Sequence, residues 1–245
     1  MNILKKIAAY MTPFQWFEVL GVIGFTIYFA VIDKESEMWY TILSSIAAIA
    51  GIFCVVLCAA GRKSQYYWGF INIAGYVAVS WMMKFYGEVM LNALYYLPTQ
   101  FLGLYLWNKH SAQEEGFVKC RRLSPLWTCI LLVVSALGIW GYKYLLTALG
   151  GNAAWLDSAS TVISIVANAL MVLRFREQWL LWIIVDAVTV VMWLGTGDYI
   201  MTAMWAFYLL NAVYGFVTWT RRAAAGVTHS EATPSESSAS CDGSS

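Results

Sequence analysis

A stripe of aromatic and acidic side chains follows one apolar stretch of the chain, residues 178–193. Its members, spaced by three or four residues, are Trp179, Trp182, Asp186, Thr189 and Trp193. On a helix these positions share one face. Indole rings stack on flat ligands and favour cationic ones by about 0.5–2 kcal/mol, and a carboxylate beside them would balance a positive charge. The stripe therefore predicts a lined cavity that binds a ligand.

Asp186 supports this interpretation because the residues around it are apolar enough to lie in a membrane. A carboxylate in hydrocarbon costs roughly 2.5–3.5 kcal/mol on insertion scales, so the side chain is expected to face protein or water. Two structural alternatives stay open. Tryptophans near the ends of a span commonly form interfacial belts, and a mid-membrane acid or amide commonly joins two helices.

A second stripe lies earlier in the chain and resembles the first. It consists of Gln65, Trp68, Asn72, Tyr76 and Val79. Both stripes place an indole four residues before an amide or an acid. We therefore expect Asn72 and Asp186 to orient the same ligand or to balance its charge.

The two stripes belong to a longer internal repeat. An offset of 114 residues pairs Arg62 with Arg176, Trp68 with Trp182 and Asn72 with Asp186. Later in the repeat, an offset of 112 pairs Tyr96 with Tyr208, Thr99 with Asn211, Gly103 with Gly215 and Trp107 with Trp219. The shift preserves the direction of each span across the membrane. The copies are therefore expected to be parallel repeats, one of the two repeat types found in transporters.

Polar side chains in the last span of each copy complete the candidate site. Gln100 and Asn211 lie deep within their predicted spans and supply donors and acceptors. Pro98 removes a backbone donor and is expected to kink its helix, either as a hinge or as a packing bend. The predicted substrate-binding residues are Trp68, Asn72, Gln100, Trp179, Trp182, Asp186, Asn211 and Tyr214.

The other reactive residue types predict neither catalysis nor metal binding. Only two histidines are present, His110 in a loop and His229 in the tail, and the five cysteines show no metal-ligand spacing. No nucleophile motif, phosphate-binding loop or dinucleotide fingerprint has a plausible context. Asp186 is the only acid or base expected in the middle of a span. We therefore expect no enzyme activity, no catalytic residue, no metal and no cofactor.

Membrane helices are the elements that must position these residues. Of the 245 residues, 60% are hydrophobic and 12% are charged, against about 25% charged in soluble domains. About 20 apolar residues span a bilayer as a helix. Eight stretches qualify, roughly 14–32, 38–60, 65–85, 88–108, 125–148, 157–174, 178–196 and 199–220. The predicted fold is all-α integral membrane with eight transmembrane helices, and the net charge of +1 excludes a nucleic-acid footprint.

The repeat divides these spans into two parallel triple-helix bundles, arranged 3+1+3 around a linker helix, with one extra helix at the N-terminus. The predicted divisions are an N-terminal helix (1–37), a first bundle (38–108), a loop with the linker helix (109–156), a second bundle (157–222) and a tail (223–245). The tail is rich in serine and cannot bury a core, so it is expected to be disordered.

The distribution of positive charge predicts the orientation. With eight spans, one side of the membrane carries both termini and twelve of the fifteen Lys and Arg residues. By the positive-inside rule this side is cytoplasmic. No cleavage pattern follows the first apolar stretch, which is therefore expected to be a retained span and not a signal peptide.

With the stripes, the repeat and the 3+1+3 core described, the chain resembles the PnuC family of bacterial vitamin transporters over about residues 14–221. The motif that carries the resemblance is W-x-x-W-x-x-x-N/D. Trp179, Trp182 and Asp186 match it in full, whereas the earlier copy has Gln65 in place of the first tryptophan. The resemblance implies an architecture like that of the SWEET sugar transporters, a homotrimer, and a place in the bacterial cytoplasmic (inner) membrane.

The resemblance also implies a substrate, the pyridine nucleoside nicotinamide riboside, which has a flat cationic ring, an amide and ribose hydroxyls. It implies vitamin uptake by facilitated diffusion, with metabolic trapping by cytoplasmic phosphorylation. Related family members carry thiamine or riboflavin, so another ring-containing vitamin is the first alternative. A non-transporting membrane sensor is the second alternative, although the chain has neither a signalling domain nor a lysine in its last span for a retinal Schiff base.

Overall fold

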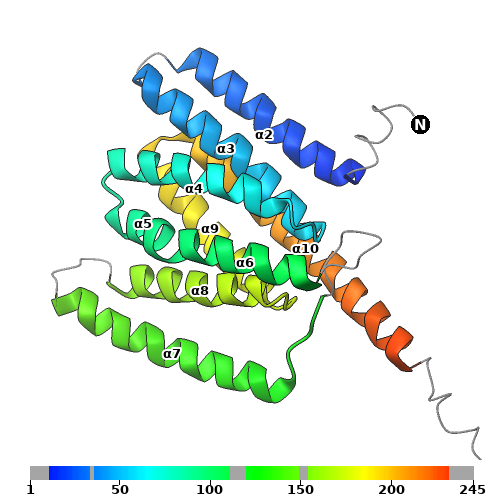
Figure 1. Cartoon of the computed structure of the whole chain (residues 1–245). Coiled ribbons are helices and arrows are strands. Elements are labelled where there is room, and N and C mark those ends of the chain that lie inside the picture. Colours follow the sequence, from blue (N-terminus) through cyan, green and yellow to red (C-terminus); the bar gives the residue numbers. More distant parts are fainter. Residues whose placement is uncertain (1–10, 34–35, 111–119, 149–153, 232–245) are drawn as a thin grey trace, which may run out of the picture.

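The computed structural model describes residues 11–33, 36–110, 120–148 and 154–231. In these ranges the chain forms helices joined by short turns (Figure 1). The helices are α2 (Pro13–Ile32), α3 (Met38–Ala59), α4 (Gln65–Met82), α5 (Tyr86–Met90), the π-helix η1 (Leu91–Tyr96), α6 (Leu97–His110), α7 (Pro125–Ala148), α8 (Ala154–Val172), α9 (Gln178–Thr196) and α10 (Tyr199–Glu231).

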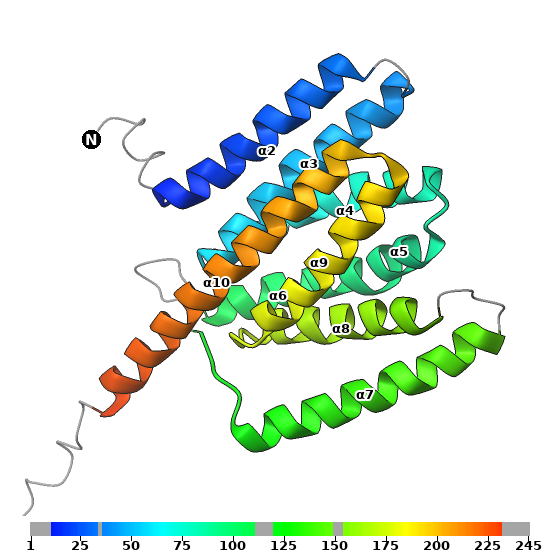
Figure 2. The same ribbon diagram turned by 180° about the vertical axis from the view of Figure 1, so that it is seen from behind.

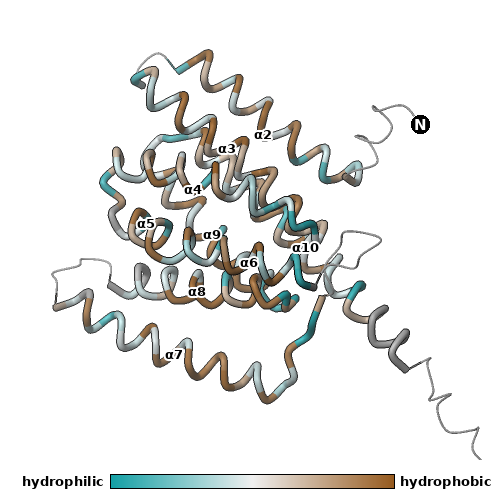
Figure 3. Tube along the Cα trace, viewed as in Figure 1, coloured by the Kyte–Doolittle hydropathy of each residue, from teal (hydrophilic) through white to brown (hydrophobic). Residues whose placement is uncertain are grey.

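These elements confirm the predicted fold class, all-α and integral to a membrane. α5, η1 and α6 follow one another without a break and together form the predicted fourth span. By length and composition, α2, α3, α7, α9 and α10 are apolar enough to cross a membrane. α4 contains several polar residues, for which the cavity described below gives the reason. Hydropathy along the chain shows mostly apolar helices, with hydrophilic residues in the turns and at scattered positions within the helices (Figure 3).

Local sequence explains where the first helix begins. The hydroxyl of Thr12 accepts from the backbone N–H of Gln15 at 3.3 Å, and the side chain of Gln15 accepts from the N–H of Thr12 at 2.9 Å. This capping box satisfies two helix N–H groups that would otherwise lack partners. Pro13 follows as the first helical residue, where its missing N–H costs nothing.

The arrangement in space places α2 and α7 at opposite edges of the bundle (Figures 1 and 2). α2 packs against α3 and α10, and α7 packs against α8. The remaining helices, from α3 to α6 and from α8 to α10, lie between these two edges. We call α3, α4 and α5–α6 the first triplet, and α8, α9 and α10 the second triplet.

Turn geometry relates the two triplets residue by residue. The turn after α3 places Gly61 in the left-handed region (φ 74°), and the turn after α8 places Arg174 there (φ 66°). The turns after α4 and α9 do the same with Lys84 and Gly197 (φ 61° and 77°). In both cases the offset is 113 residues. The turn hydrogen bonds, such as Gly61 N–H to Cys58 O and Arg174 N–H to Met171 O, follow the same offset.

This register corrects the sequence alignment, which used an offset of 114 for the same helices. Gln65 and Gln178 are the first residues of α4 and α9, so the position equivalent to Asp186 is Ile73 and not Asn72. The alignment by residue type was wrong by one position because it paired Trp68 with Trp182. The equivalent backbone turns show which residues of the two triplets correspond.

The π-helix η1 accounts for the later change of offset. Lys84 and Gly197 differ by 113 residues, whereas Trp107 and Trp219 differ by 112, so the first triplet has one more residue between these positions. η1 lies in this interval, and a π-turn holds one residue more than an α-turn. Pro98 follows directly in α6. The sequence predicted an irregularity at this proline, and the structure places the π-turn immediately before it.

The last helix is longer than predicted. The sequence places the start of a disordered tail at residue 223, but α10 continues to Glu231. The run Ala223, Ala224 and Ala225 explains the extension, because alanine has the highest helix propensity. The rest of the predicted tail lies outside the described residues.

Candidate ligand-binding site

A cavity lies between the two triplets, and every helix from α3 to α10 except α7 contributes to its wall. The space that it encloses, including the opening, is about 960 Å³. The lining residues are Cys54, Val55, Cys58, Gln65, Asn72, Ile73, Tyr76, Glu88, Leu91, Asn92, Tyr96, Gln100, Ser164, Asn168, Met171, Trp179, Trp182, Val185, Asp186, Thr189, Met204, Trp205, Tyr208 and Asn211.

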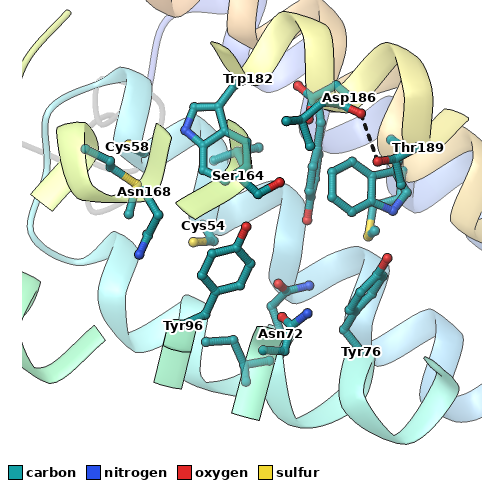
Figure 4. A pocket seen from close by; sticks show the side chains of 18 of the residues that line it. Cys54, Cys58, Asn72, Tyr76, Tyr96, Ser164, Asn168, Trp182, Asp186 and Thr189 are labelled. Carbon is teal, nitrogen blue, oxygen red and sulfur yellow. Dashed lines mark hydrogen bonds between the residues drawn. The ribbon is translucent and has the colours of Figure 1, made fainter. Parts of the chain in front are cut away.

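Six of the eight residues predicted to bind substrate line this cavity. They are Asn72, Gln100, Trp179, Trp182, Asp186 and Asn211. α9 contributes Trp182, Asp186 and Thr189 to one wall, and Tyr96, Asn72 and Tyr76 lie on the facing wall (Figure 4). The ring centroids of Trp182 and Tyr96 are 6.4 Å apart. The cavity thus contains aromatic faces, amides and a carboxylate.

The other two predicted residues lie outside the cavity. The indole of Trp68 stacks on Phe53, with ring centroids 4.5 Å apart and an interplanar angle of 19°. The ring of Tyr214 lies 4.8 Å from that of Phe14, and its hydroxyl is 3.1 Å from the hydroxyl of Thr12. Both residues therefore hold helices together. The one-residue change of register explains Trp68, because it turns this indole away from the cavity.

The carboxylate of Asp186 is buried in the middle of α9, with 3% of the residue exposed. It has no hydrogen-bond or ion-pair partner among the residues that the structure describes. The hydroxyl of Thr189, one turn further on, donates to the carbonyl of Val185 at 2.8 Å and not to the carboxylate. A buried charge of this kind is expected only where a partner arrives. Asp186 therefore has the position and the free acceptors to bind a cationic ligand.

Several polar atoms around the cavity also lack partners within the described parts of the chain. They are Nε2 of Gln65, Oε1 of Gln100, Nε1 of Trp179, the hydroxyl of Tyr208 and Oδ1 of Asn211. Buried polar groups in proteins are nearly always hydrogen-bonded, to protein, water or ligand. Donors and acceptors are both present in this set, as a ligand with hydroxyl and amide groups would require.

Two of the cavity amides are oriented by the backbone of α3. Nδ2 of Asn72 donates to the carbonyl of Ala47 at 2.8 Å, and Nδ2 of Asn211 donates to the carbonyl of Val55 at 3.0 Å. These bonds use the donor end of each amide. The oxygen of each amide is thereby fixed in position as an acceptor.

Tryptophan pairs close the cavity at the end where α9 begins. Nε1 of Trp219 donates to the carbonyl of Ala59, and Nε1 of Trp107 donates to the carbonyl of Met171. Each indole therefore bonds the last turn of the first helix in the opposite triplet. Trp219 also packs edge to face on Trp179, with centroids 5.8 Å apart. The two triplets are joined here by equivalent contacts.

The opposite end of the cavity is built differently. Nε1 of Trp193 donates to the hydroxyl of Tyr76 at 3.1 Å, and Phe85 packs edge to face on Trp193. Further out, the hydroxyl of Tyr40 donates to the carboxylate of Asp198. Trp179 and Trp193 are fourteen residues apart on one helix, about 21 Å at 1.5 Å per residue. Asp186 lies midway between the two closed ends.

The sequence analysis missed two acids in the bundle. Glu88 lines the cavity although it lies near the start of its span, and Glu18 in α2 is completely buried, with both carboxylate oxygens unpartnered. Both lie near the start of their spans, so Asp186 remains the acid in the middle of a span, but it is not the only acid inside the bundle. The signal for Glu88 was its place one turn before Asn92, to which its carbonyl is bonded. Glu18 follows Gln15 at helical spacing on the buried face of α2.

Charge in the cavity has one sign. Asp186 and Glu88 are the ionisable carboxyl groups in its wall, and no lysine, arginine or histidine is among the residues that line it. Such a cavity favours a cation over an anion. The groups of three or more His, Cys, Asp or Glu side chains needed to hold a metal are also absent from the described residues.

Comparisons with known proteins agree with this geometry. Residues 41–221 match the family model described as nicotinamide mononucleotide transporter. The nicotinamide riboside transporter PnuC of Neisseria mucosa is 40% identical over 189 residues, 73% of this chain and 72% of the relative. The protein of the same name from Haemophilus influenzae is 36% identical over 181 residues, 73% of this chain and 79% of the relative.

A solved structure is also similar. The crystal structure of the vitamin B3 transporter PnuC matches with a TM-score of 0.77 and 37% sequence identity, over 87% of this chain and 93% of that chain. Because 87% of this chain is covered, the match includes residues of both triplets.

Proposed function

The chain belongs to the PnuC family of membrane transporters, and on this premise we propose that it carries nicotinamide riboside through the cavity between the two triplets. The observation that carries the proposal is the unpartnered carboxylate of Asp186 beside the indole of Trp182. A pyridinium ring is flat and permanently charged. Stacking on the indole and neutralisation by the carboxylate satisfy both properties.

The charge of the cavity selects the riboside over its phosphorylated form. The family description names a mononucleotide, and the curated relatives are named for the riboside. The two compounds differ by a phosphate group. Two carboxyl groups and no basic side chain line the cavity, so a phosphate there would meet like charge without compensation. The riboside has no such group and a positive ring.

The cavity amides are suited to the rest of the molecule. We assign Asn72, Gln100 and Asn211 to the amide and the ribose hydroxyls of the substrate, because each has an oxygen or nitrogen in the cavity wall. Trp179 has an unpartnered Nε1 and adds a donor at the end where the tryptophan pairs lie. The proposed substrate-binding residues are Asn72, Gln100, Trp179, Trp182, Asp186 and Asn211, without Trp68 and Tyr214.

Binding of nicotinamide riboside to purified protein tests this proposal most directly. In isothermal titration calorimetry we expect Trp182→Ala to weaken binding at least about tenfold, the loss of roughly 1.4 kcal/mol. Trp68→Ala is the matched control, because its indole stacks on Phe53 outside the cavity, and its affinity should stay unchanged. No binding by the wild type, or equal loss in both variants, would defeat the assignment.

Other ring-containing vitamins compete as explanations for the same cavity. Thiamine is cationic and riboflavin is neutral, so stacking alone does not separate them from the riboside. A thermal-shift screen across pyridine, thiamine and flavin compounds ranks the three. We expect the largest rise in melting temperature with nicotinamide riboside.

We further propose facilitated diffusion with trapping by phosphorylation in the cytoplasm, and no catalysis by this chain. Glu18 and Glu88 make a test of proton coupling necessary. Proteoliposomes should accumulate labelled riboside only to the external concentration, with or without a proton ionophore. Accumulation above that level under a pH gradient would show coupling and contradict this part of the proposal.

The proposed setting is the bacterial inner membrane, with both termini in the cytoplasm and the triplets arranged 3+1+3 around α7. Arg121, Arg174 and Arg176 lie together at the turn between α8 and α9, and the positive-inside rule would place this end of the bundle on the cytoplasmic side. A homotrimer is proposed from the family resemblance. Light scattering of the detergent-solubilised protein measures its mass, and reporter fusions at each terminus measure the orientation.

A further inference from the structure

The turn between α8 and α9 contains an arginine in an unusual situation. Arg174 is 8% exposed, and its Nε has no hydrogen-bond partner. Its side chain makes no ion pair within the parts of the chain that the structure describes. Buried charges in proteins are normally paired, because an unpaired one loses its hydration without compensation. Burial and the charge of Arg121 both lower the pKa of the Arg174 guanidinium, although an arginine remains charged.

The backbone of Arg174 is also unfavourable. Its φ of 66° lies in the left-handed region, which glycine adopts readily and other residues rarely. The equivalent turn of the first triplet has Gly61 at this position, with φ 74°. Arg174 therefore raises the free energy of the folded state twice, through its left-handed backbone and through the burial of its charge. Residues with such unfavourable conformations are found mainly at functional sites.

Neighbouring arginines are held against Arg174 by the backbone. The N–H of Arg121 donates to the carbonyl of Arg174 at 2.8 Å, and the N–H of Arg176 donates to the carbonyl of Arg121 at 3.0 Å. Arg176 is paired with Glu177 at 3.0 Å. Arg121 is exposed, and its guanidinium lies over the ring of Phe175, 4.6 Å from the centroid. Two like charges, Arg174 and Arg121, are thus held close together, and neither forms an ion pair with an acid among the described residues.

A third arginine, Arg222, lies near Arg174, because both influence the thiol of Cys120. Burial raises the pKa of this thiol to about 11, and the charges of Arg222 and Arg174 act in the opposite direction. The hydroxyl of Tyr66, which lies close enough to interact electrostatically with Arg174, is buried and unpartnered as well. The unpartnered Nε of Arg174 and the unpartnered hydroxyl of Tyr66 therefore lie in one positively charged region of the bundle. An anion with several oxygens is the partner that would satisfy them.

We propose that Arg174 and Arg121 form a binding site for a phosphate group at this end of the bundle, separate from the cavity. Planar guanidinium groups bind phosphate oxygens through paired N–H donors. The phosphate could belong to a free phosphomonoester or to the headgroup of an anionic lipid, and the chemistry at the site is the same. This site goes beyond the proposed transport of the riboside and does not depend on it.

Arg174→Gly is the decisive variant, because it restores the residue found in the equivalent turn and removes the charge. Without added anion, we expect it to melt at a higher temperature than the wild type, since strain and an unpaired charge both disappear. Lys109→Gln is the matched control. It removes one exposed positive charge at the end of α6 and should leave the melting temperature and the anion response unchanged.

Anion binding is measured on the full-length protein in nanodiscs of phosphatidylcholine, by thermal shift and titration with inorganic phosphate and nicotinamide mononucleotide. A second set of nanodiscs contains phosphatidylglycerol. Stabilisation of the wild type by the soluble anions identifies a free phosphomonoester, and stabilisation only by phosphatidylglycerol identifies a lipid headgroup. In either case Arg174→Gly should weaken the response about tenfold or more, with unchanged riboside binding.

Three results would overturn the proposal. One is an equal response of the wild type and Arg174→Gly to every anion, and another is an equal loss in Lys109→Gln. The third is a lower melting temperature in Arg174→Gly, with an equal decrease in the double variant Glu114→Gln/Glu115→Gln and no response of either to anions. This result would mean that Arg174 is paired with an acid of its own chain. Failure of riboside binding in the wild type would refute the transport proposal alone.

Discussion

The two triplets share a backbone and differ in the side chains that reach the cavity. In the first triplet, Gly69 on α4 leaves room for the side chain of Gln100, whose Nε2 lies only 2.5 Å from where a Cβ would be. In the second triplet, Trp182 is equivalent to Gly69 and Ala212 is equivalent to Gln100, so the large side chain is on α9 and the small one is on α10. The first triplet thus presents an amide to the cavity, and the second presents an indole.

Charge follows the same division. Asp186 is equivalent to Ile73 in the first triplet, and both line the cavity. In the proposed complex, the second triplet supplies the indole and the carboxylate for a cationic ring, while the first supplies Gln100 and Asn72 for hydroxyl and amide groups. Two unlike halves suit a ligand with two unlike ends. Divergence between the two triplets is therefore what the proposed binding of an asymmetric molecule requires.

The contacts between the triplets, by contrast, are kept equal. Trp107 and Trp219 each donate to a carbonyl in the last turn of the other triplet's first helix, at 3.2 and 3.1 Å. Beside each of these indoles, packing within the triplet is also kept equal: Gly103 lies against the ring of Tyr66 in the first triplet, and Gly215 lies against the ring of Trp179 in the second. Positions that join the halves are conserved between the copies, and positions that face the cavity are not.

The largest expected effect concerns the charge found in one triplet only. Asp186→Asn should weaken binding of nicotinamide riboside by about 10- to 150-fold, the equivalent of the 1.5–3 kcal/mol typical of hydrogen bonds to charged groups. A neutral, reduced form of the riboside should lose much less. Calorimetry on both ligands measures the difference, with Asp198→Asn, a buried aspartate outside the cavity, as control. Equal loss for the two ligands would show that Asp186 acts through hydrogen bonding alone.

The next effect tests the equality of the equivalent glycine contacts within the two triplets. In Gly215→Ala the new Cβ would lie 2.6 Å from the ring of Trp179, which is packed edge to face on Trp219. We expect a loss of stability of about 1–3 kcal/mol, as for other overpacked cores, and a similar loss for Gly103→Ala. Gly24→Ala has nothing within 4 Å of the new atom and should be neutral or stabilising. Chemical denaturation in detergent measures all three, and unequal losses at Gly103 and Gly215 would break the symmetry.

A smaller effect is expected from the indole hydrogen bonds. Trp219→Phe and Trp107→Phe each remove one donor from a fully buried site, where both tryptophans are 0% exposed. Each should lower stability by about 1 kcal/mol. The loss in the double variant should differ from the sum of the two, because the rings of Trp107 and Trp219 pack on each other with centroids 6.0 Å apart, and residues in contact are not additive. A loss in one variant only would show that one triplet carries the interface.

The smallest effect concerns the amide half of the cavity. Gly69→Ala should displace the flexible end of Gln100 without moving the backbone, so that stability is kept. Affinity for the riboside should fall by about 2- to 13-fold, corresponding to one neutral hydrogen bond of 0.5–1.5 kcal/mol. Ala212→Gly, at the position equivalent to Gln100, is the control. Unchanged affinity in Gly69→Ala would remove Gln100 from the substrate-binding set.

The sequence by itself determined the class of the protein, the existence of a repeat and six of the residues that line the cavity. The reason is that hydrophobic length and helical spacing are local properties. A stretch such as 178–196 must cross a membrane wherever it lies, and Trp182 and Asp186 must share a face once the helix forms. Six of the eight predicted substrate-binding residues line the cavity for this reason.

Only the tertiary structure decided which residues of the two triplets correspond. It also decided that Trp68 faces away from the cavity and which buried charges have partners. Alignment by residue type paired Trp68 with Trp182, which are not equivalent. The offset between the triplets follows from the left-handed turns at Gly61 and Arg174, and these two turns share no residue type that an alignment could match. Glu18 looked like an ordinary residue near the start of a span until packing buried it, and Glu88 lies in the cavity wall only in the folded chain. Arg174 looked like one more cytoplasmic arginine, and only the fold buries it without an ion-pair partner among the described residues, since burial and pairing depend on residues far apart in the chain.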